Sequence, residues 1–217
     1  MIRHLFSLAC ALAIFTAVPA SAQNTLNIQL KSGVVKIEML PDLAPNHVER
    51  IKTLASQGAY DGVAFHRVID GFMAQAGDVQ HGKVQTDGSV SRRVGSGGSS
   101  LPDLAQEFSA TPVTRGTVAM ARTPDPDSAN SQFFIMFEDA SFMNDLPSSV
   151  REQVLADPDL LDEAAANPNR NQFIRNFYTV WGRVSSGMEL VDNIKKGSRA
   201  NNGSVSEPDQ MIRVWVE

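Results

Sequence analysis

The fold and the function of this chain both depend on the stretch FHRVIDGFMAQAGD, at residues 65–78. The stretch places one cation, Arg67, close in sequence to two large apolar side chains, Phe72 and Met73, and to one amide, Gln75. A charged group that is buried away from water requires a partner. Two interpretations therefore stay open: a surface arginine with a solvated tip, or an apolar pocket into which one guanidinium group points.

Two short strands joined by a tight turn are predicted within this stretch. Residues 63–68 and 72–75 have the composition of strands, and Asp70-Gly71 between them is a turn signal. Because side chains alternate between the two faces of a strand, Arg67 should share a face with Phe65. An arginine beside an aromatic residue on one face is unusual for a plain hydrophobic core.

The overall composition is that of one globular domain. The chain has 217 residues, 42% hydrophobic and 20% charged, which is enough for one sizeable core. Its formal net charge is -5, and its basic residues are scattered along the sequence. Because nucleic-acid binding requires clustered Lys and Arg, we expect no nucleic-acid partner.

Residues 1–22 have the pattern of a secretory signal peptide. An apolar run at 5–18 precedes Ala20-Ser21-Ala22, which fits a small-residue cleavage site, so the mature chain would begin at Gln23. The apolar run is too short to favour a membrane span, and we expect no stable membrane insertion. Cys10 would leave with the signal, so the mature chain would contain neither a thiol nor a disulfide.

The first part of the mature chain predicts a hairpin followed by a helix. Residues 25–30 and 34–40 alternate around a short turn, as antiparallel strands do. Pro45 suits the first turn of a helix and Gly58 its end, with apolar residues at helical spacing between them. His47 falls outside that apolar face, and we expect a surface or structural role for it.

Two further strands surround the middle of the chain. Residues 80–110 are rich in Gly, Ser and Asp but lack the helix and lysine of a phosphate-binding loop, so they are interpreted as a loop able to line a groove. Residues 116–121 form a compact apolar strand. The apolar run at 130–137 indicates a strand buried on both faces, with Gln132 and Phe134 on the same face.

Four motifs follow one another along the chain: FHRVI at 65–69, GFMAQAGD at 71–78, GTVAMA at 116–121 and SQFFI at 131–135. Together they resemble the cyclophilin family of peptidyl-prolyl cis-trans isomerases, and the similarity extends from about Asn27 to the C-terminus. The bacterial branch of the family is the most similar.

The many strands and two helices, the second at 187–194, predict a mainly β fold: a closed antiparallel β-barrel capped by two helices. We expect a single isomerase domain at 23–217 after the signal peptide at 1–22.

An insertion at 147–176 departs from the small members of this family. It separates two motifs that are normally a few residues apart, and it is 30 residues long. Val150, Val154 and Leu155 share a helical face within it, and residues 159–166 fit a second short helix. The insertion is either a solvent-exposed helical decoration or a lid or partner surface beside the groove.

The resemblance implies a set of site residues. Arg67 would donate hydrogen bonds toward the prolyl nitrogen or the carbonyl, while Gln75 and Gln132 would orient the arginine and the substrate. Apolar side chains would enclose the proline ring. The catalytic set is Arg67, Phe72, Gln75 and Gln132, and the substrate-binding set is Phe65, Met73, Met120, Ala121, Arg122, Phe134, Phe142, Met143 and Tyr178.

Three positions differ from the usual family pattern. Arg122 stands where Asn is frequent, Tyr178 stands where many members have His, and Phe142 replaces the Trp of many eukaryotic members. The resemblance then implies weak binding of cyclosporin. Because the insertion follows Phe142 directly, Phe173 or Phe177 remains an alternative for that wall of the groove.

A prolyl isomerase needs neither a cofactor nor a metal. Rotation about a peptide bond is opposed by a barrier of about 18–20 kcal/mol that arises from amide resonance, and a dry pocket with one well-placed donor lowers it. We therefore expect an isomerase that acts on unfolded or extended proline-containing polypeptides during the folding of exported proteins. It would be a monomer, and periplasmic if the source is a Gram-negative bacterium.

Two other function classes were weighed against this one. A proline-peptide binding module or chaperone with incidental catalysis remains the alternative, because the insertion offers a partner surface. A hydrolase is disfavoured, since the mature chain lacks Cys and has no G-x-S-x-G motif. His66 should also face away from Arg67, which argues against a catalytic base.

Overall fold

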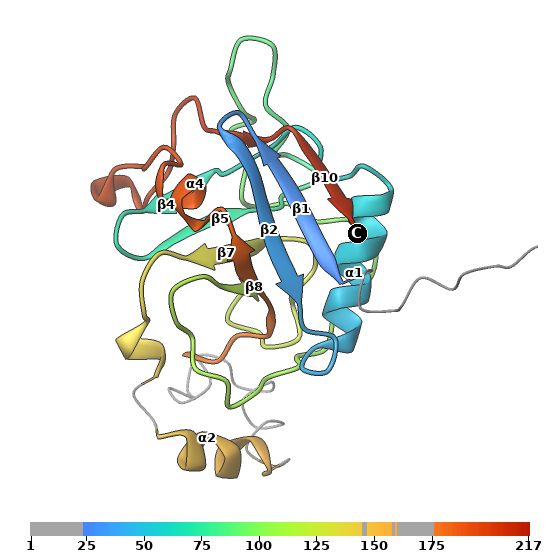
Figure 1. The fold of residues 1–217 in the computed structure, drawn as a ribbon, viewed down its shortest axis with the longest axis vertical. Coiled ribbons are helices and arrows are strands. Elements are labelled where there is room, and N and C mark those ends of the chain that lie inside the picture. The colour runs from blue at the N-terminus through green and yellow to red at the C-terminus, as the bar shows by residue number, and fades with distance from the viewer. Residues whose placement is uncertain (1–23, 145–146, 158, 160–175) are drawn as a thin grey trace, which may run out of the picture.

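The computed structural model describes residues 24–144, 147–157, 159 and 176–217, without the side chains of Phe142 and Ser148 (Figure 1). The described part is mainly β, as predicted. Its strands are β1 (Thr25–Leu30), β2 (Gly33–Met39), β3 (Val63–Ala64), β4 (Arg67–Ile69), β5 (Met73–Ala76), β6 (Thr117–Met120), β7 (Phe133–Met136), β8 (Val180–Ser186), β9 (Gln210–Met211) and β10 (Arg213–Val216).

Short helices flank these strands. The predicted helix after Pro45 is confirmed as α1 (Pro45–Ser56), the one at 187–194 as α4 (Met188–Asp192), and the first helix of the insertion as α2 (Ser148–Leu155). Two 3₁₀ helices are η2 (Ser141–Met143) and η4 (Arg199–Asn201). The second predicted helix of the insertion, at 159–166, lies outside the described residues apart from Asp159. No described helix has the length and apolar character that crossing a membrane requires.

The main sheet is a curled half-barrel, and the predicted closed barrel is not seen. Its eight strands pair in the order β10-β1-β2-β8-β6-β7-β5-β4, while β3 and β9 form a separate pair. No ladder joins the edges β4 and β10 in the described part of the chain, and β4 with the residues before it instead forms single backbone hydrogen bonds with the stretch at 203–209. The amide of Phe65 donates to the carbonyl of Asp209 at 2.8 Å, and that of Val68 donates to Gly203 at 2.8 Å.

The central strand β7 is buried on both faces, as its apolar run predicted. Phe133 and Ile135 pack into the main core, which also contains the fully buried Trp181. Phe134 and Met136 belong to a second, smaller apolar cluster on the opposite face of the sheet. Because neighbouring strands follow the same alternation, the sheet separates a stable core from a second apolar surface.

The predicted single strand at 63–68 is wrong. The chain leaves β3 after Ala64 and enters β4 at Arg67, so residues 65 and 66 belong to no strand. The expected period of two therefore does not extend from Phe65 to Arg67. The side chain of Phe65 fills the main core at 1% exposure, whereas that of Arg67 is half-buried on the other side.

A carboxylate from the long central loop takes the place of a local cap for α1. Ala44 precedes the helix and provides no capping side chain. Glu107 instead accepts hydrogen bonds from the backbone amides of Asn46 at 3.1 Å and His47 at 3.0 Å. These amides lack partners within the helix, and a negative charge there is favourable. Glu107 thus fixes α1 to the loop at 80–110.

His47 is fully buried beside this carboxylate, so it has a structural position and not a surface one. Its Nδ1 lies 2.6 Å from Oε2 of Glu107. Desolvation lowers the pKa of His47, and the hydrogen bond to Glu107 opposes this only in part. Burial alone would raise the pKa of Glu107, but hydrogen bonds from His47 and Asn46 outweigh it and lower that pKa.

We predict that Glu107→Ala destabilises the fold by about 1–3 kcal/mol, because the amides of α1 and the ring of His47 lose their acceptor. Urea unfolding followed by circular dichroism measures this change. Glu49→Ala is the matched control, since Glu49 is exposed on the same helix and its loss should change stability by less than about 0.5 kcal/mol. Equal stabilities for the two variants would contradict the capping role.

Candidate active site

A cavity of about 310 Å³ lies on the face of the sheet that carries the smaller apolar cluster. Strands β4, β5 and β7 supply one side, and the segments after β6, at η2 and before β8 supply the other. Every residue that lines the cavity is among the predicted site residues. They are Arg67, Phe72, Met73, Gln75, Ala121, Arg122, Phe134, Met143 and Tyr178.

Strand register places the polar and apolar parts of this cavity side by side. Arg67 on β4 pairs with Gln75 on β5, Gln75 pairs with Phe134 on β7, and Phe134 pairs with Ala119 on β6. Directly opposed side chains in a sheet lie on the same face. One row across four strands therefore carries a cation, an amide, an aromatic ring and a small residue that leaves room for a ligand.

Arg67 is held from two sides. Its Nη1 donates to Oε1 of Gln75 at 3.1 Å, its Nη2 donates to Oδ1 of Asn202 at 3.0 Å, and its Nε donates to the carbonyl of Asn202 at 3.1 Å. A guanidinium group has five N–H donors. Within the described residues two of these donors remain for a ligand, and Arg67 lines the cavity as a half-buried side chain.

Burial is the main cause that lowers the pKa of Arg67, and Tyr178 opposes this. An arginine in a protein keeps its proton. Arg67 therefore provides a permanent positive charge, fixed in direction, beside an apolar cavity.

The amides extend this support into the glycine-rich loop. Gln75 Nε2 donates to Oε1 of Gln132 at 3.0 Å. Gln132 Nε2 donates in turn to the carbonyls of Gly95 at 3.0 Å and Gly97 at 2.8 Å. Gln132 lines a neighbouring cavity of about 590 Å³, which also contains Gln75, Ala121 and Arg122 and therefore continues the first one.

A buried carboxylate holds the loop in this position. Asp78 is fully buried, and its Oδ2 accepts hydrogen bonds from the amides of Gly95 at 2.8 Å and Gly97 at 3.0 Å. A Cβ atom added to Gly97 would lie 2.5 Å from Oδ1 of Asp78, so only glycine fits there. Asp78 is thus connected to Arg67 through Gln132 and Gln75.

The far wall of the cavity contains two aromatic residues and one arginine. The ring of Tyr178 stands edge-on to that of Phe134, with centroids 5.2 Å apart. The guanidinium of Arg122 lies over the Tyr178 ring at 4.9 Å and donates to the carbonyl of Phe177 at 2.8 Å. Burial is the main cause that lowers the pKa of Arg122. Arg122 therefore supports the wall in addition to lining it.

Comparison with known proteins identifies the family to which this site belongs. The family model for the cyclophilin type peptidyl-prolyl cis-trans isomerases matches residues 25–216. The chain belongs to the cyclophilin family. Its activity is the cis-trans isomerisation of peptide bonds that precede proline.

Curated relatives agree with this assignment. A probable peptidyl-prolyl cis-trans isomerase of Brucella suis is 48% identical over 205 residues, covering 94% of this chain and 88% of the relative. Peptidyl-prolyl cis-trans isomerase B of Escherichia coli is 30% identical over 171 residues, covering 79% and 84%.

Solved structures support the fold. A cyclophilin from Hirschia baltica has a TM-score of 0.61 at 22% identity, covering 90% of this chain and 74% of that one. A cyclophilin from Cryptosporidium parvum has a TM-score of 0.61 at 18% identity, covering 89% and 98%.

Two predicted binding residues lie away from the cyclophilin cavity. Phe65 and Met120 are each 1% exposed, and both side chains pack in the main core. Met120 alternates with Ala119 and Ala121, which belong to the cavity face. The side chain of Phe142 lies outside the described residues. The alternation of side chains along β6 turns Met120 into the core, and Phe65 lies in the interruption between β3 and β4, where its side chain also enters the core.

Sequence reasoning missed several supporting residues. Asn202 is one of them, because nothing in the sequence places it beside Arg67. Asp78 ends the central motif but carries no local sign of its loop contacts. Both depend on contacts between segments that are distant in sequence. Phe177, predicted as an alternative for the far wall, is buried and contacts Phe108, with ring centroids 5.8 Å apart, while Phe173, the other alternative, lies outside the described residues.

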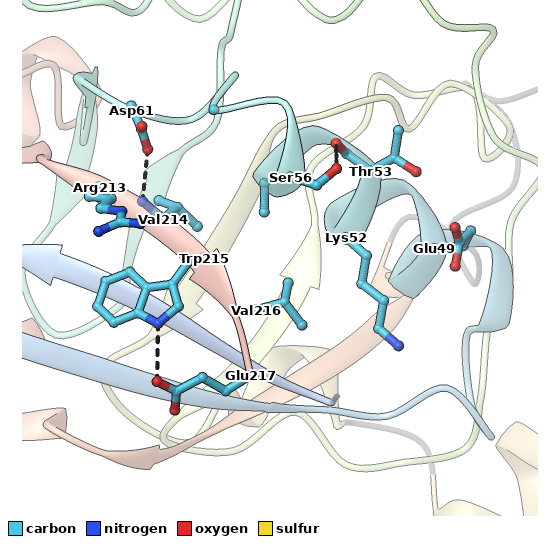
Figure 2. Close-up of a pocket in the computed structure, with 12 residues that line it drawn as sticks. Glu49, Lys52, Thr53, Ser56, Asp61, Arg213, Val214, Trp215, Val216 and Glu217 are labelled. Atoms are coloured by element: carbon cyan, nitrogen blue, oxygen red, sulfur yellow. Dashed lines mark hydrogen bonds between the residues drawn. The ribbon is translucent and has the colours of Figure 1, made fainter. Parts of the chain in front are cut away.

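Another cavity, of about 850 Å³, lies between α1 and β10, the edge of the sheet opposite β4 (Figure 2). Lys52 and Arg213 line it together with Glu49 and Glu217, so it has no single sign of charge. Trp215 donates through Nε1 to Oε1 of Glu217 at 3.2 Å. None of the predicted site residues lines this cavity, and the described residues form no cluster of three or more His, Cys, Asp or Glu side chains able to hold a metal.

We predict that Asn202→Gly lowers kcat/KM for a proline-containing peptide by about tenfold, equivalent to about 1.4 kcal/mol. Asn202 has a φ of 53°, which glycine adopts without strain, so the carbonyl that accepts from Arg67 is kept and only Oδ1 is lost. A peptide isomerisation assay measures the effect. Asn201→Ala, on the exposed neighbour, should have normal kinetics, and unchanged kinetics for Asn202→Gly would contradict the positioning of Arg67.

Proposed function

We propose that this cyclophilin binds the proline ring of an extended polypeptide in the 310 Å³ cavity, with Arg67 directed at the rotating amide. The observation that carries the proposal is the pair of Arg67 donors left free beside an apolar cavity. Phe72, Met73 and Phe134 form the floor for the ring, and Tyr178 forms the far side. Gln132 orients the substrate backbone at the junction with the neighbouring cavity.

Selective stabilisation of the twisted amide explains how this geometry accelerates rotation. In a planar amide the nitrogen lone pair is delocalised into the carbonyl, and rotation localises it on the nitrogen. A donor fixed beside that nitrogen therefore forms a stronger hydrogen bond in the transition state than in the ground state. An interaction of this kind raises kcat, and it is stronger where water is excluded. No proton or electron is transferred in this mechanism.

Exported proteins in the course of folding are the proposed clients. Residues 1–22 have the pattern of a cleaved signal, and slow prolyl isomerisation limits the folding of many chains. The Cryptosporidium cyclophilin was crystallised in the presence of the dipeptide Ala-Pro, which supports a proline-containing ligand here. We propose that the mature enzyme acts as a monomer in the periplasm of a Gram-negative source.

We predict that Arg67→Ala lowers kcat by roughly 10²–10³-fold, as expected for loss of one transition-state donor, while the fold is retained. Peptide isomerisation and a proline-limited refolding reaction measure it, with circular dichroism as the check on folding. Arg213→Ala removes one positive charge from the opposite edge of the sheet and serves as the control. A folded Arg67→Ala enzyme with normal turnover would refute the assigned role.

Export has its own prediction. When the full chain is expressed in a Gram-negative bacterium, we expect the protein in the periplasmic fraction, with Gln23 as its N-terminal residue. N-terminal sequencing and intact mass spectrometry distinguish this product from the full chain. A protein that keeps residues 1–22 and remains in the cytoplasmic fraction would contradict the export proposal without affecting the isomerase assignment.

A further inference from the structure

The insertion helix α2 has an unusual distribution of exposed and buried side chains. Its arginine, Arg151, is 4% exposed, whereas its apolar neighbour Val150 is 37% exposed and Glu152 and Gln153 face solvent. Arginine is rarely buried unless it makes specific contacts. Figure 1 shows α2 outside the sheet, connected to it through η2. Among the described side chains of α2, Arg151 is the most deeply buried.

Arg151 contacts both of the segments that flank the insertion. Its Nη1 donates to the carbonyl of Met143 at 2.5 Å, at the point where the chain leaves the cavity wall. Its guanidinium carbon lies 4.3 Å from the centroid of the Phe177 ring, where the chain returns. A longer contact, 3.5 Å from Nη2 to the carbonyl of Ser109, adds the central loop. One side chain thus connects three segments.

These segments form the far wall of the proline cavity. Met143 lines the cavity directly, and Phe177 precedes Tyr178, whose ring stands against Phe134. Arg122 holds the carbonyl of Phe177 from the cavity side, while Arg151 covers its ring. Two arginines thus contact Phe177 next to Tyr178, Arg122 from the segment after β6 and Arg151 from the insertion.

The contacts require the shape of an arginine and not only its charge. A guanidinium group is planar, so its face stacks on an aromatic ring while its edge donates to carbonyl oxygens. A lysine ammonium lacks this plane. None of the described residues forms an ion pair with Arg151, so carbonyl dipoles and the Phe177 ring compensate its charge. Its desolvation lowers its pKa, as expected for a cation that gives up water.

We propose that Arg151 is a positioning residue through which the insertion fixes the far wall of the proline cavity. The inference rests on the proposed use of that cavity by the proline ring. Arg151 does not reach the reacting amide, since it contacts Met143 and Phe177 from behind the wall. Its loss should weaken ring binding equally in the ground state and the transition state, which raises KM and leaves kcat nearly unchanged.

Steady-state kinetics of Arg151→Gln and Arg151→Lys on a proline-containing peptide test this proposal. We expect KM to rise by roughly tenfold in both folded variants, the factor that corresponds to about 1.4 kcal/mol of binding free energy, with kcat changed less than about twofold. Gln153→Ala is the matched control on the same helix, and its KM should equal that of the native chain. Hydrogen exchange should quicken at residues 177–179 in the Arg151 variants and stay unchanged in β1 and β2.

Each other outcome overturns the proposal. A folded Arg151 variant with native KM would show that the wall stands without the arginine. Failure of both variants to fold would assign Arg151 to general stability. A fall in kcat at constant KM would place its effect on the reaction itself. The outcome for the Arg151 variants is independent of the role of Arg67. The Arg151 variants are expected to change KM, whereas Arg67→Ala is expected to change kcat.

Discussion

A guanidinium group can leave bulk water only where acceptors surround it, and the site of this protein is built around meeting that requirement for Arg67. Gln75 supplies one acceptor because it lies directly across the β4–β5 pairing. Asn202 supplies two more from a turn that is 135 positions away in the sequence. The sheet register and the turn must both form before the arginine has a fixed direction. Arg67 then lines a cavity that apolar side chains share with Gln75 and Arg122.

The same requirement explains the polar chain that extends from Arg67. Gln75 and Gln132 pass hydrogen bonds to the glycine-rich loop, which the buried Asp78 carboxylate holds in place. Each of these amide groups both donates and accepts a hydrogen bond. The network is therefore continuous from the Arg67 guanidinium to the Asp78 carboxylate. The loop at 80–110 thus has fixed positions at the points where it meets the site, although its sequence resembles that of an ordinary surface loop.

Two departures from the usual family pattern are physically linked. Arg122 and Tyr178 stand where Asn and His are frequent, and the guanidinium of Arg122 lies over the Tyr178 ring at 4.9 Å. The insertion adds Arg151 on the other side of Phe177. These residues form a modified wall in which cation–π contacts take part, while the catalytic side of the cavity keeps the family motif.

The sequence by itself predicted most of the strands, the helix α1 and the two-faced burial of β7, and through the family motifs it named the residues that line the cavity. It left the state of Arg67 open and placed Phe65 and Met120 in the site, whereas both side chains fill the core. Only the tertiary structure decided these points, together with the roles of Asn202 and Arg151 and the open edges of the sheet. The sequence could not decide these points because periodicity and turn chemistry, on which its predictions rest, depend only on neighbours along the chain. The interruption of the strand at residues 65 and 66 depends on register and packing between distant segments. So does the hydrogen bond from Arg67 to an acceptor 135 positions away.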